Sequence, residues 1–183
     1  MTTQEKLMTA EELFLLPDDG MEHELVRGEL RTMPPPGFRH EEIALQVALQ
    51  LGGFVKAHRL GRAVGGPGFR LERHPDTVRA PDFAFIAAGR LPAGPPPIAY
   101  PDLAPDLVVE VVSPGDTATE VQAKIEEWLR AGVRLALVLF PDTRSVAAYR
   151  NANDIRLLGP DDVLEIGDVL PGFTCQVREL FPE

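Results

Sequence analysis

The sequence predicts an α/β fold with a mixed central β-sheet flanked by helices, in a single domain that spans residues 1–183. An apolar run at 107–112, an amphipathic helix and a second apolar run at 133–140 are typical of a parallel strand–helix–strand unit. Shorter alternating segments after residue 145 indicate antiparallel strands. The composition, 44% hydrophobic and 25% charged over 183 residues, fits one globular core.

The N-terminal third is expected to contain one capped helix, one hairpin and one longer helix. Thr9, with Glu12 three residues later, forms a capping-box pattern that begins a short helix. The stretch 23–33 predicts two short strands around a turn at Gly28. From 40 to 58, apolar residues recur at three- and four-residue steps, which indicates an amphipathic helix.

The rest of the chain alternates strands with a second capped helix. Thr117 and Glu120 repeat the capping box, and the helix that follows is expected to end near Ala131, with Gly132 as its stop. A proline-rich segment at 91–105 is predicted to be a surface loop. Strands are expected at 68–72, 78–86, 107–112, 133–140, 145–149, 155–158 and 163–166.

The charge distribution is uneven. The net charge of −10 argues against a protein that coats nucleic acid through bulk electrostatics. The segment 56–90 differs from the rest, because it carries seven Lys or Arg against three Asp or Glu and is locally +4. This pattern fits a phosphate-facing surface and a solvated, arginine-rich face equally well.

Targeting and redox signals are few. No apolar run approaches the roughly 20 residues of a membrane-spanning helix, and the first residues lack the basic end and apolar stretch of a secretory signal. We therefore expect no membrane partner and a cytoplasmic location. The single cysteine, Cys175, cannot form an internal disulfide and has no second cysteine for a thiolate metal site. It is expected to be a small buried residue.

Two carboxylates stand in apolar, strand-like segments. Glu110 interrupts the run 107–112, and Asp82 follows Pro81 within the stretch 78–86. Burying a carboxylate costs several kcal/mol unless it is paired or binds a metal, so each needs a partner. Either one alone also fits a strand-edge acid bonded to backbone or arginine, but the pair favours a shared site.

Lys124 is expected at the depth of Glu110. The helix after Ser113 runs back along the strand, and Lys124 lies seven residues beyond Thr117, about 10 Å at the rise of an α-helix. Glu110 lies three residues before Ser113, also about 10 Å at the rise of a strand. Lys124 falls at the border of the apolar stripe of the helix, so its ammonium can turn toward the sheet or extend to solvent.

Asp82, Glu110 and Lys124 are the groups that a metal-dependent phosphodiester hydrolase requires. Two carboxylates offer hard oxygen ligands to Mg²⁺. A lysine can orient the nucleophile or stabilise the charge that develops during the reaction.

The chain has Pro81-Asp82, a gap and then Glu110-Val111-Val112. This order resembles the PD-(D/E)XK nuclease signature, and specifically a large bacterial family of restriction-endonuclease-like proteins of unknown function. The resemblance implies a restriction-endonuclease-like mixed central β-sheet flanked by helices, a Mg²⁺ or Mn²⁺ cofactor, and a homodimeric endonuclease that acts on DNA. Val112 stands where the signature has its lysine, and the resemblance suggests Lys124 as the replacement. The similar segments, which together span nearly the whole chain, are 24–30, His40, Pro81-Asp82, 106–110 with Val111-Val112, Ser113-Pro114, Lys124, Gly132-Val133 and 170–173.

Two further site residues are implied less specifically. The resemblance places an acid from the N-terminal part in the metal site, for which Glu24 or Glu29 could serve, although each also fits a solvated acid. His40, at the start of the second helix, fits a catalytic base or metal ligand as well as a helix cap or a hydrogen bond with the hairpin.

Three functions remain open. The first is Mg²⁺-dependent hydrolysis of DNA, with Asp82 and Glu110 as ligands and Lys124 as the catalytic cation. The second is a non-catalytic binding or scaffold protein that keeps the nuclease fold, which the acidic charge and the missing in-strand lysine favour. The third is a metal-dependent nuclease that acts on RNA.

Overall fold

The computed structural model describes residues 7–90, 94–95 and 97–182. These residues form two compact units. The first takes in the described residues of 1–35, 67–80 and 94–104, and the second those of 36–66, 81–93 and 105–183. The prediction of a single domain stays a prediction.

The first unit is built on a four-stranded antiparallel sheet in the order β2-β1-β5-β4. The predicted capping box is confirmed, since Thr9 caps α1 and Glu12 bonds back to it. The predicted hairpin is also confirmed, and its two-residue loop has positive φ at Arg27 and Gly28, which is the geometry of a type I′ turn. The elements are α1 (Ala10–Phe14), β1 (Glu22–Val26), β2 (Glu29–Met33), β4 (Phe69–Glu72) and β5 (Thr77–Arg79).

The second unit contains a six-stranded sheet in the order β10-β9-β8-β7-β6-β3, in which β7 and β8 are parallel and the other neighbours antiparallel. The predicted parallel strand–helix–strand unit is therefore confirmed as β7, α4 and β8. The sheet strands are β3 (Gly61–Val64), β6 (Phe83–Ala87), β7 (Leu107–Val111), β8 (Leu135–Phe140), β9 (Ser145–Asn151) and β10 (Asp154–Leu158).

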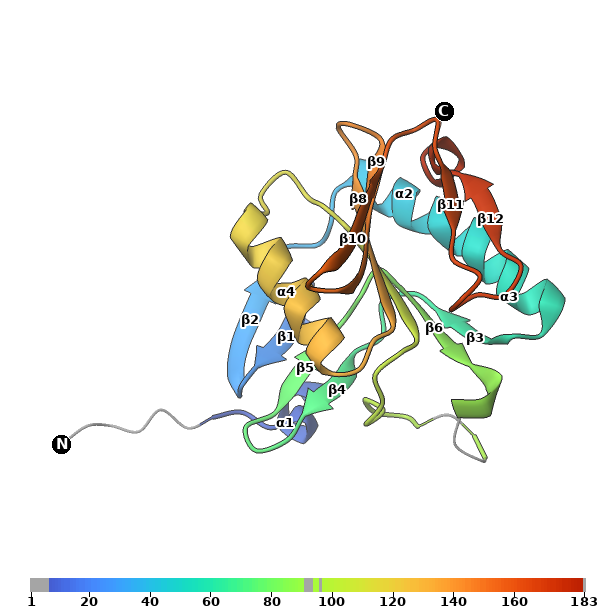
Figure 1. Ribbon diagram of the computed structural model, residues 1–183. Helices are drawn as coiled ribbons and strands as arrows, with labels where there is room; N and C mark the ends of the chain where they lie inside the picture. The colour runs from blue at the N-terminus through green and yellow to red at the C-terminus, as the bar shows by residue number, and fades with distance from the viewer. Residues whose placement is uncertain (1–6, 91–93, 96, 183) are drawn as a thin grey trace. The chain divides into compact units, whose positions relative to one another are not determined.

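Helices cover both faces of this sheet. Figure 1 shows α4 (Ala118–Arg130) on one face, and α2 (Phe38–Val47) and α3 (Gly53–His58) on the other. The π-helix η1 (Ala48–Gly52) joins α2 to α3, so the predicted long helix is present with one wider turn. Short elements complete the unit: 3₁₀-helices η2 (Ala88–Arg90) and η3 (Val177–Leu180), and the antiparallel pair β11 (Val163–Glu165) and β12 (Thr174–Gln176).

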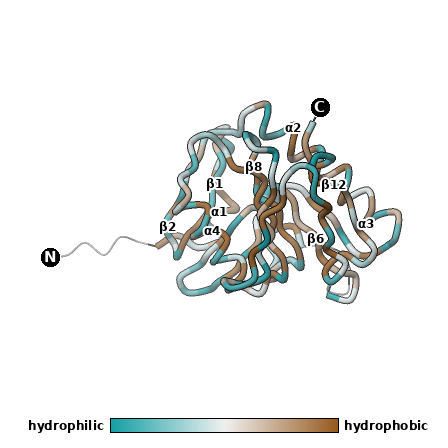
Figure 2. Tube along the Cα trace, turned by 45° about the horizontal axis from the view of Figure 1, so that its top comes forward, coloured by the Kyte–Doolittle hydropathy of each residue, from teal (hydrophilic) through white to brown (hydrophobic). Residues whose placement is uncertain are grey.

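Residues alternate between the two faces of the central strands. Val109 and Val111 join the hydrophobic cluster that includes Ile43 and Val47 of α2. Residues between them in sequence point to the α4 side, because successive side chains of a strand face opposite ways. The hydropathy-coloured trace shows the hydrophobic central strands, such as β8, that form this core (Figure 2).

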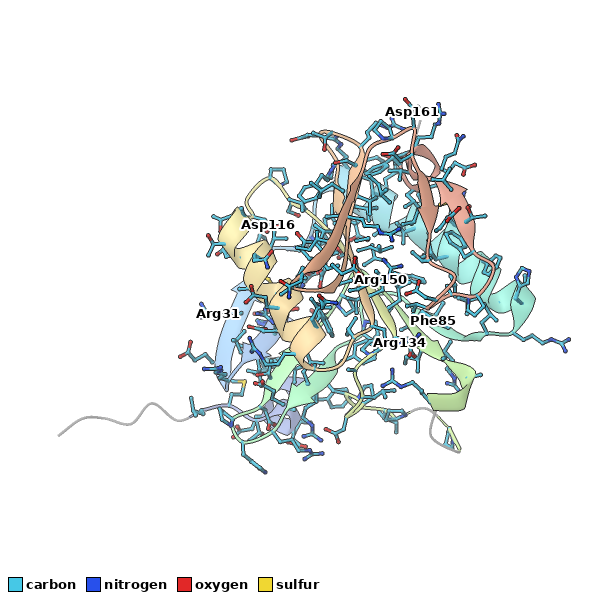
Figure 3. All side chains as sticks on the ribbon, viewed as in Figure 1. Arg31, Phe85, Asp116, Arg134, Arg150 and Asp161 are labelled. Atoms are coloured by element: carbon cyan, nitrogen blue, oxygen red, sulfur yellow. The ribbon has the colours of Figure 1, made fainter. Side chains whose placement is uncertain are left out.

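Asp168 connects the C-terminal segment to the six-stranded sheet. Arg150, in β9, donates two hydrogen bonds to the carboxylate of Asp168 at 2.9 and 2.8 Å. Arg134, just before β8, donates to the backbone carbonyl of the same residue at 2.6 Å. Figure 3 labels both arginines. Arg150 holds the pKa of Asp168 below its usual range despite partial burial.

Three expectations about the chain were incomplete. The stretch 78–86 is two strands, β5 and β6, which belong to different sheets. The break falls at 80–82, where Pro81 has no N–H to continue a ladder. Strands β3 and β12 were missed, because the first is four residues bounded by glycines and the second only three residues long. Cys175, in β12, is partly and not fully buried.

Among the described residues no helix is long and apolar enough to cross a membrane.

Candidate active site

Glu110 lies in β7 on the α4 side of the six-stranded sheet. Its side chain is only 11% exposed. One carboxylate oxygen, Oε2, accepts a hydrogen bond from Lys124 Nζ at 2.9 Å, and the other, Oε1, accepts one from Trp128 Nε1 at 2.7 Å. A carboxylate buried this deeply is stabilised by a cation and a neutral donor that reach its two oxygens separately.

Helix α4 positions both donors. Thr117 caps its N-terminus, and Glu120 completes the predicted capping box. Lys124 and Trp128 are four residues apart, so they lie one above the other on the same face of the helix. The depth argument for Lys124 is confirmed by its contact with Glu110.

Asp82 lies at the end of β6 closest to Glu110. Pairing of β6 with β7 begins at Phe83 and Val109, and one step further along the same register sets Asp82 opposite Glu110. Instead of extending the strand, Asp82 occupies a bend, and its Oδ2 accepts a hydrogen bond from the N–H of Val111 at 2.6 Å. The side chain therefore replaces a backbone ladder bond and lies where the paired strands β6 and β7 end.

His40, in the first turn of α2, contacts Asp82. Its Nε2 lies 3.3 Å from Asp82 Oδ2. Burial opposes a charge on His40, but the contact with Asp82 outweighs it, so the pKa of the imidazole is raised. Its Nδ1 is buried without a hydrogen-bond partner among the described residues, since Glu41 Oε1 is 3.6 Å away.

The N-terminal acids lie in the first unit. Glu24, in β1, is 3% exposed and accepts hydrogen bonds from Arg79 at 2.7 Å and from the N–H of Ala80 at 2.8 Å. Glu29 is exposed and pairs with Arg31. The role of Glu24 as a metal ligand stays a prediction.

The locally basic segment does not form one surface of free cations. Four of its seven members make ion pairs with acids of the protein; these are Arg70, Arg73, Arg79 and Arg90. Lys56, Arg59 and Arg62 have no ion-pair partner in the part of the chain that the structure describes. We call these three residues, which lie on and between α3 and β3, the basic edge.

The carboxylates of Asp82 and Glu110 suit a hard divalent cation. Mg²⁺ is usually held by one or two carboxylates, with waters and substrate phosphates completing its octahedron. No group of three or more His, Cys, Asp or Glu side chains within residues 7–90, 94–95 and 97–182 could hold a metal by itself. Both acids also have protein donors, so their burial is compensated in part by pairing, which the sequence analysis left open beside a metal. Asp82 and Glu110 nevertheless fit a metal that is shared with water and phosphate.

One site residue was missed from the sequence. Trp128 was not among the candidate site residues, although its indole N–H bonds Glu110. The signal was present in the spacing, because Trp128 is one helical turn beyond Lys124 and a buried indole N–H needs an acceptor.

Comparisons with known proteins identify the family and support the fold. A family model described as "Uma2: Putative restriction endonuclease" matches residues 10–178. Among solved structures, the chain is similar to the crystal structure of a putative nuclease belonging to DUF820 from Anabaena variabilis. The identity is 24% and the TM-score 0.81, over 95% of this chain and 97% of that chain. This likeness confirms the predicted nuclease-like α/β fold. No curated protein matches the chain.

Proposed function

Because the chain belongs to the Uma2 family of putative restriction endonucleases, we propose that it is a Mg²⁺-dependent nuclease that hydrolyses phosphodiester bonds of DNA. The observation that carries the proposal is the convergence at one end of β7 of two carboxylates and a lysine. Lys124 Nζ lies 2.9 Å from Glu110, and Asp82 bonds the N–H of the residue after Glu110. A site of this kind combines hard oxygen ligands with a mobile cation.

Asp82 and Glu110 would hold Mg²⁺ or Mn²⁺. The bound ion supplies an activated water and offsets negative charge on the phosphate. Asp82 suits this work because its side chain is 22% exposed, so a metal can reach it from solvent, while its Oδ2 is held by the backbone. Glu110 is more deeply buried and its orientation is held by α4.

Lys124 would bring positive charge to the reacting phosphate. Its side chain is 24% exposed, so it can exchange its contact with Glu110 for one with a phosphoryl oxygen or the attacking water. Its ammonium is a compact donor with three N–H bonds.

His40 would act through Asp82. Its Nε2 faces the Asp82 carboxylate and its Nδ1 is buried, so neither ring nitrogen is open to take a proton from a water near Asp82. The contact with His40 Nε2 at 3.3 Å holds the Asp82 carboxylate in place. We therefore assign His40 an orienting role and not that of a general base.

The nucleic acid and the assembly are part of the proposal. DNA as substrate and a homodimer rest on the family resemblance, and a cytoplasmic location remains the expectation drawn from the sequence. Glu24 is retained as a further ligand to be tested with the other acids.

A cleavage assay tests the proposed function. Supercoiled plasmid, duplex and single-stranded oligonucleotides, and RNA are incubated with the protein and Mg²⁺ or Mn²⁺. We expect Asp82→Asn, Glu110→Gln and Lys124→Ala each to lower DNA cleavage by about 10²–10³-fold, as loss of one charge-stabilising group does. Arg130→Ala on the same helix and Asp142→Asn, whose side chain is 92% exposed, are the controls.

The outcomes separate the candidate functions. Cleavage of RNA alone would favour the RNA-directed nuclease. Absence of cleavage of any substrate with either metal would favour the non-catalytic binding protein, which the valine at position 112 also favours.

A further inference from the structure

Trp128 is the single tryptophan of the chain and is completely buried. Its one polar side-chain atom, Nε1, donates a hydrogen bond to Glu110 Oε1 at 2.7 Å. An indole that served packing alone could be replaced by phenylalanine without loss of a polar contact. Here the N–H is directed at the carboxylate that the proposed function assigns to the metal.

We propose that Trp128 is a positioning residue that fixes the orientation of the Glu110 carboxylate for metal binding. The inference rests on the proposed function and extends it to a residue that does not touch the metal. Donors that orient a metal ligand typically change metal affinity or activity by about 10–100-fold when they are removed.

Trp128 and Lys124 have different roles at the Glu110 carboxylate. Lys124 is flexible, partly exposed and charged, so its contact with Oε2 can be given up when a phosphate arrives. Trp128 is rigid and neutral, and its contact with Oε1 holds the carboxylate plane without cancelling the negative charge that attracts a cation. The carboxylate thus keeps one orientation before the metal binds, which lowers the entropy lost on binding.

The position of Trp128 on α4 makes this contact stable. Ile125, its neighbour on the buried face, is also 0% exposed, and the helix begins with a complete capping box. The indole plane therefore has little freedom to rotate away from Glu110.

Calorimetric titration with Mn²⁺ compares two core substitutions on the same helix. Trp128→Phe keeps an aromatic ring but removes the N–H, and Ile125→Val is a control that removes a buried methylene group and no polar atom. We expect Trp128→Phe to weaken Mn²⁺ binding about 10–100-fold and Ile125→Val to change it less than about twofold. Urea unfolding of both variants shows whether each is folded under the conditions of the titration. If both variants bind Mn²⁺ as the parent does, Trp128 has only a packing role and the inference is overturned.

A spectroscopic readout does not require metal. The protein gives one indole signal in a ¹H–¹⁵N correlation spectrum, because it has one tryptophan. We expect this signal to exchange slowly with solvent and to move in Glu110→Gln but not in the control Asp142→Asn. Fast exchange, or a signal that does not respond to Glu110→Gln, would overturn the proposed contact.

The two proposals fail in different ways. A parent protein that binds Mn²⁺ while Trp128→Phe binds it equally well refutes the positioning role alone. A parent that binds no Mn²⁺ refutes the metal site of the proposed function, and the positioning role toward metal with it.

Discussion

The ion pair between Lys124 and Glu110 is expected to stabilise the metal-free protein by a measurable amount. Lys124→Met removes the ammonium that lies 2.9 Å from Glu110 Oε2 but keeps a stem of similar length. Breaking a fully buried pair costs about 3–5 kcal/mol, and an exposed pair contributes about 0–1 kcal/mol. The two side chains are 11% and 24% exposed. The free energy of unfolding should therefore fall by about 2 kcal/mol, an intermediate value.

This loss corresponds to a visible change in thermal stability. In a protein of this size, 1 kcal/mol lowers Tm by about 2–4 °C, so Lys124→Met should lower Tm by about 4–8 °C. Urea unfolding in EDTA, followed by far-UV circular dichroism, measures the same quantity without metal. Circular dichroism is preferred because Trp128 contacts the site and its fluorescence would report a local change.

A double-mutant cycle with Glu110→Gln assigns the effect to the pair. When the Glu110→Gln substitution is already present, there is no buried negative charge to compensate. Lys124→Met should then cost much less, and the coupling energy should be about 1–2 kcal/mol. The coupling should persist in about 0.5 M salt, because partly buried pairs are weakly screened. A coupling energy below about 0.3 kcal/mol would refute the reasoning.

Three further predictions follow from other parts of the second unit. Because the pKa of His40 is raised above 6.5, its contact with Asp82 should stabilise the fold below pH 6.5 and lose this effect as pH rises through the raised pKa. Urea unfolding of the parent and of His40→Gln at several pH values measures this effect, and the difference in stability between them should shrink as pH rises. A difference that grows with pH would contradict the prediction. Burial raises the pKa of the Cys175 thiol to about 12, with Glu179 adding to the effect, so Ellman's reagent at about pH 8 should react slowly with the folded protein and rapidly in urea; equal rates would show that the thiol is not protected. Alanine substitution of all three residues of the basic edge should reduce the salt dependence of DNA binding, by about one unit of log–log slope per lost phosphate contact, and an unchanged slope would remove this surface from the interface.

Local patterns in the sequence were sufficient for much of the second unit. The apolar run around Glu110 predicts a buried central strand, and the pair Thr117 and Glu120 predicts the start of the helix that follows. Both predictions are confirmed because a strand and a capped helix are specified by residues close together in the chain. The same locality allowed the contact of Lys124 with Glu110 to be predicted, since strand rise and helix rise are constant.

The middle of the chain shows where local sequence patterns no longer predict the structure. The stretch 78–86 has the composition of one strand, but Pro81 divides it between two sheets. Pairing partners, which lie far away in sequence, decided to which sheet each half belongs. The three cations of the basic edge could not be separated from the paired arginines either, because ion pairs such as Arg70 with Asp102 join residues 32 apart.

By itself, the sequence determined the α/β class, the parallel strand–helix–strand unit and the neighbourhood of Glu110 and Lys124, because these two residues are only 14 apart and regular geometry between them leaves little choice. Only the tertiary structure decided that Asp82 bonds the N–H of Val111, that His40 reaches Asp82, and that the indole of Trp128 turns its N–H to Glu110. These contacts depend on how elements pack and on which rotamer each side chain adopts. Periodicity along a chain specifies a face of a helix or strand, but not the atom that a side chain on that face will meet.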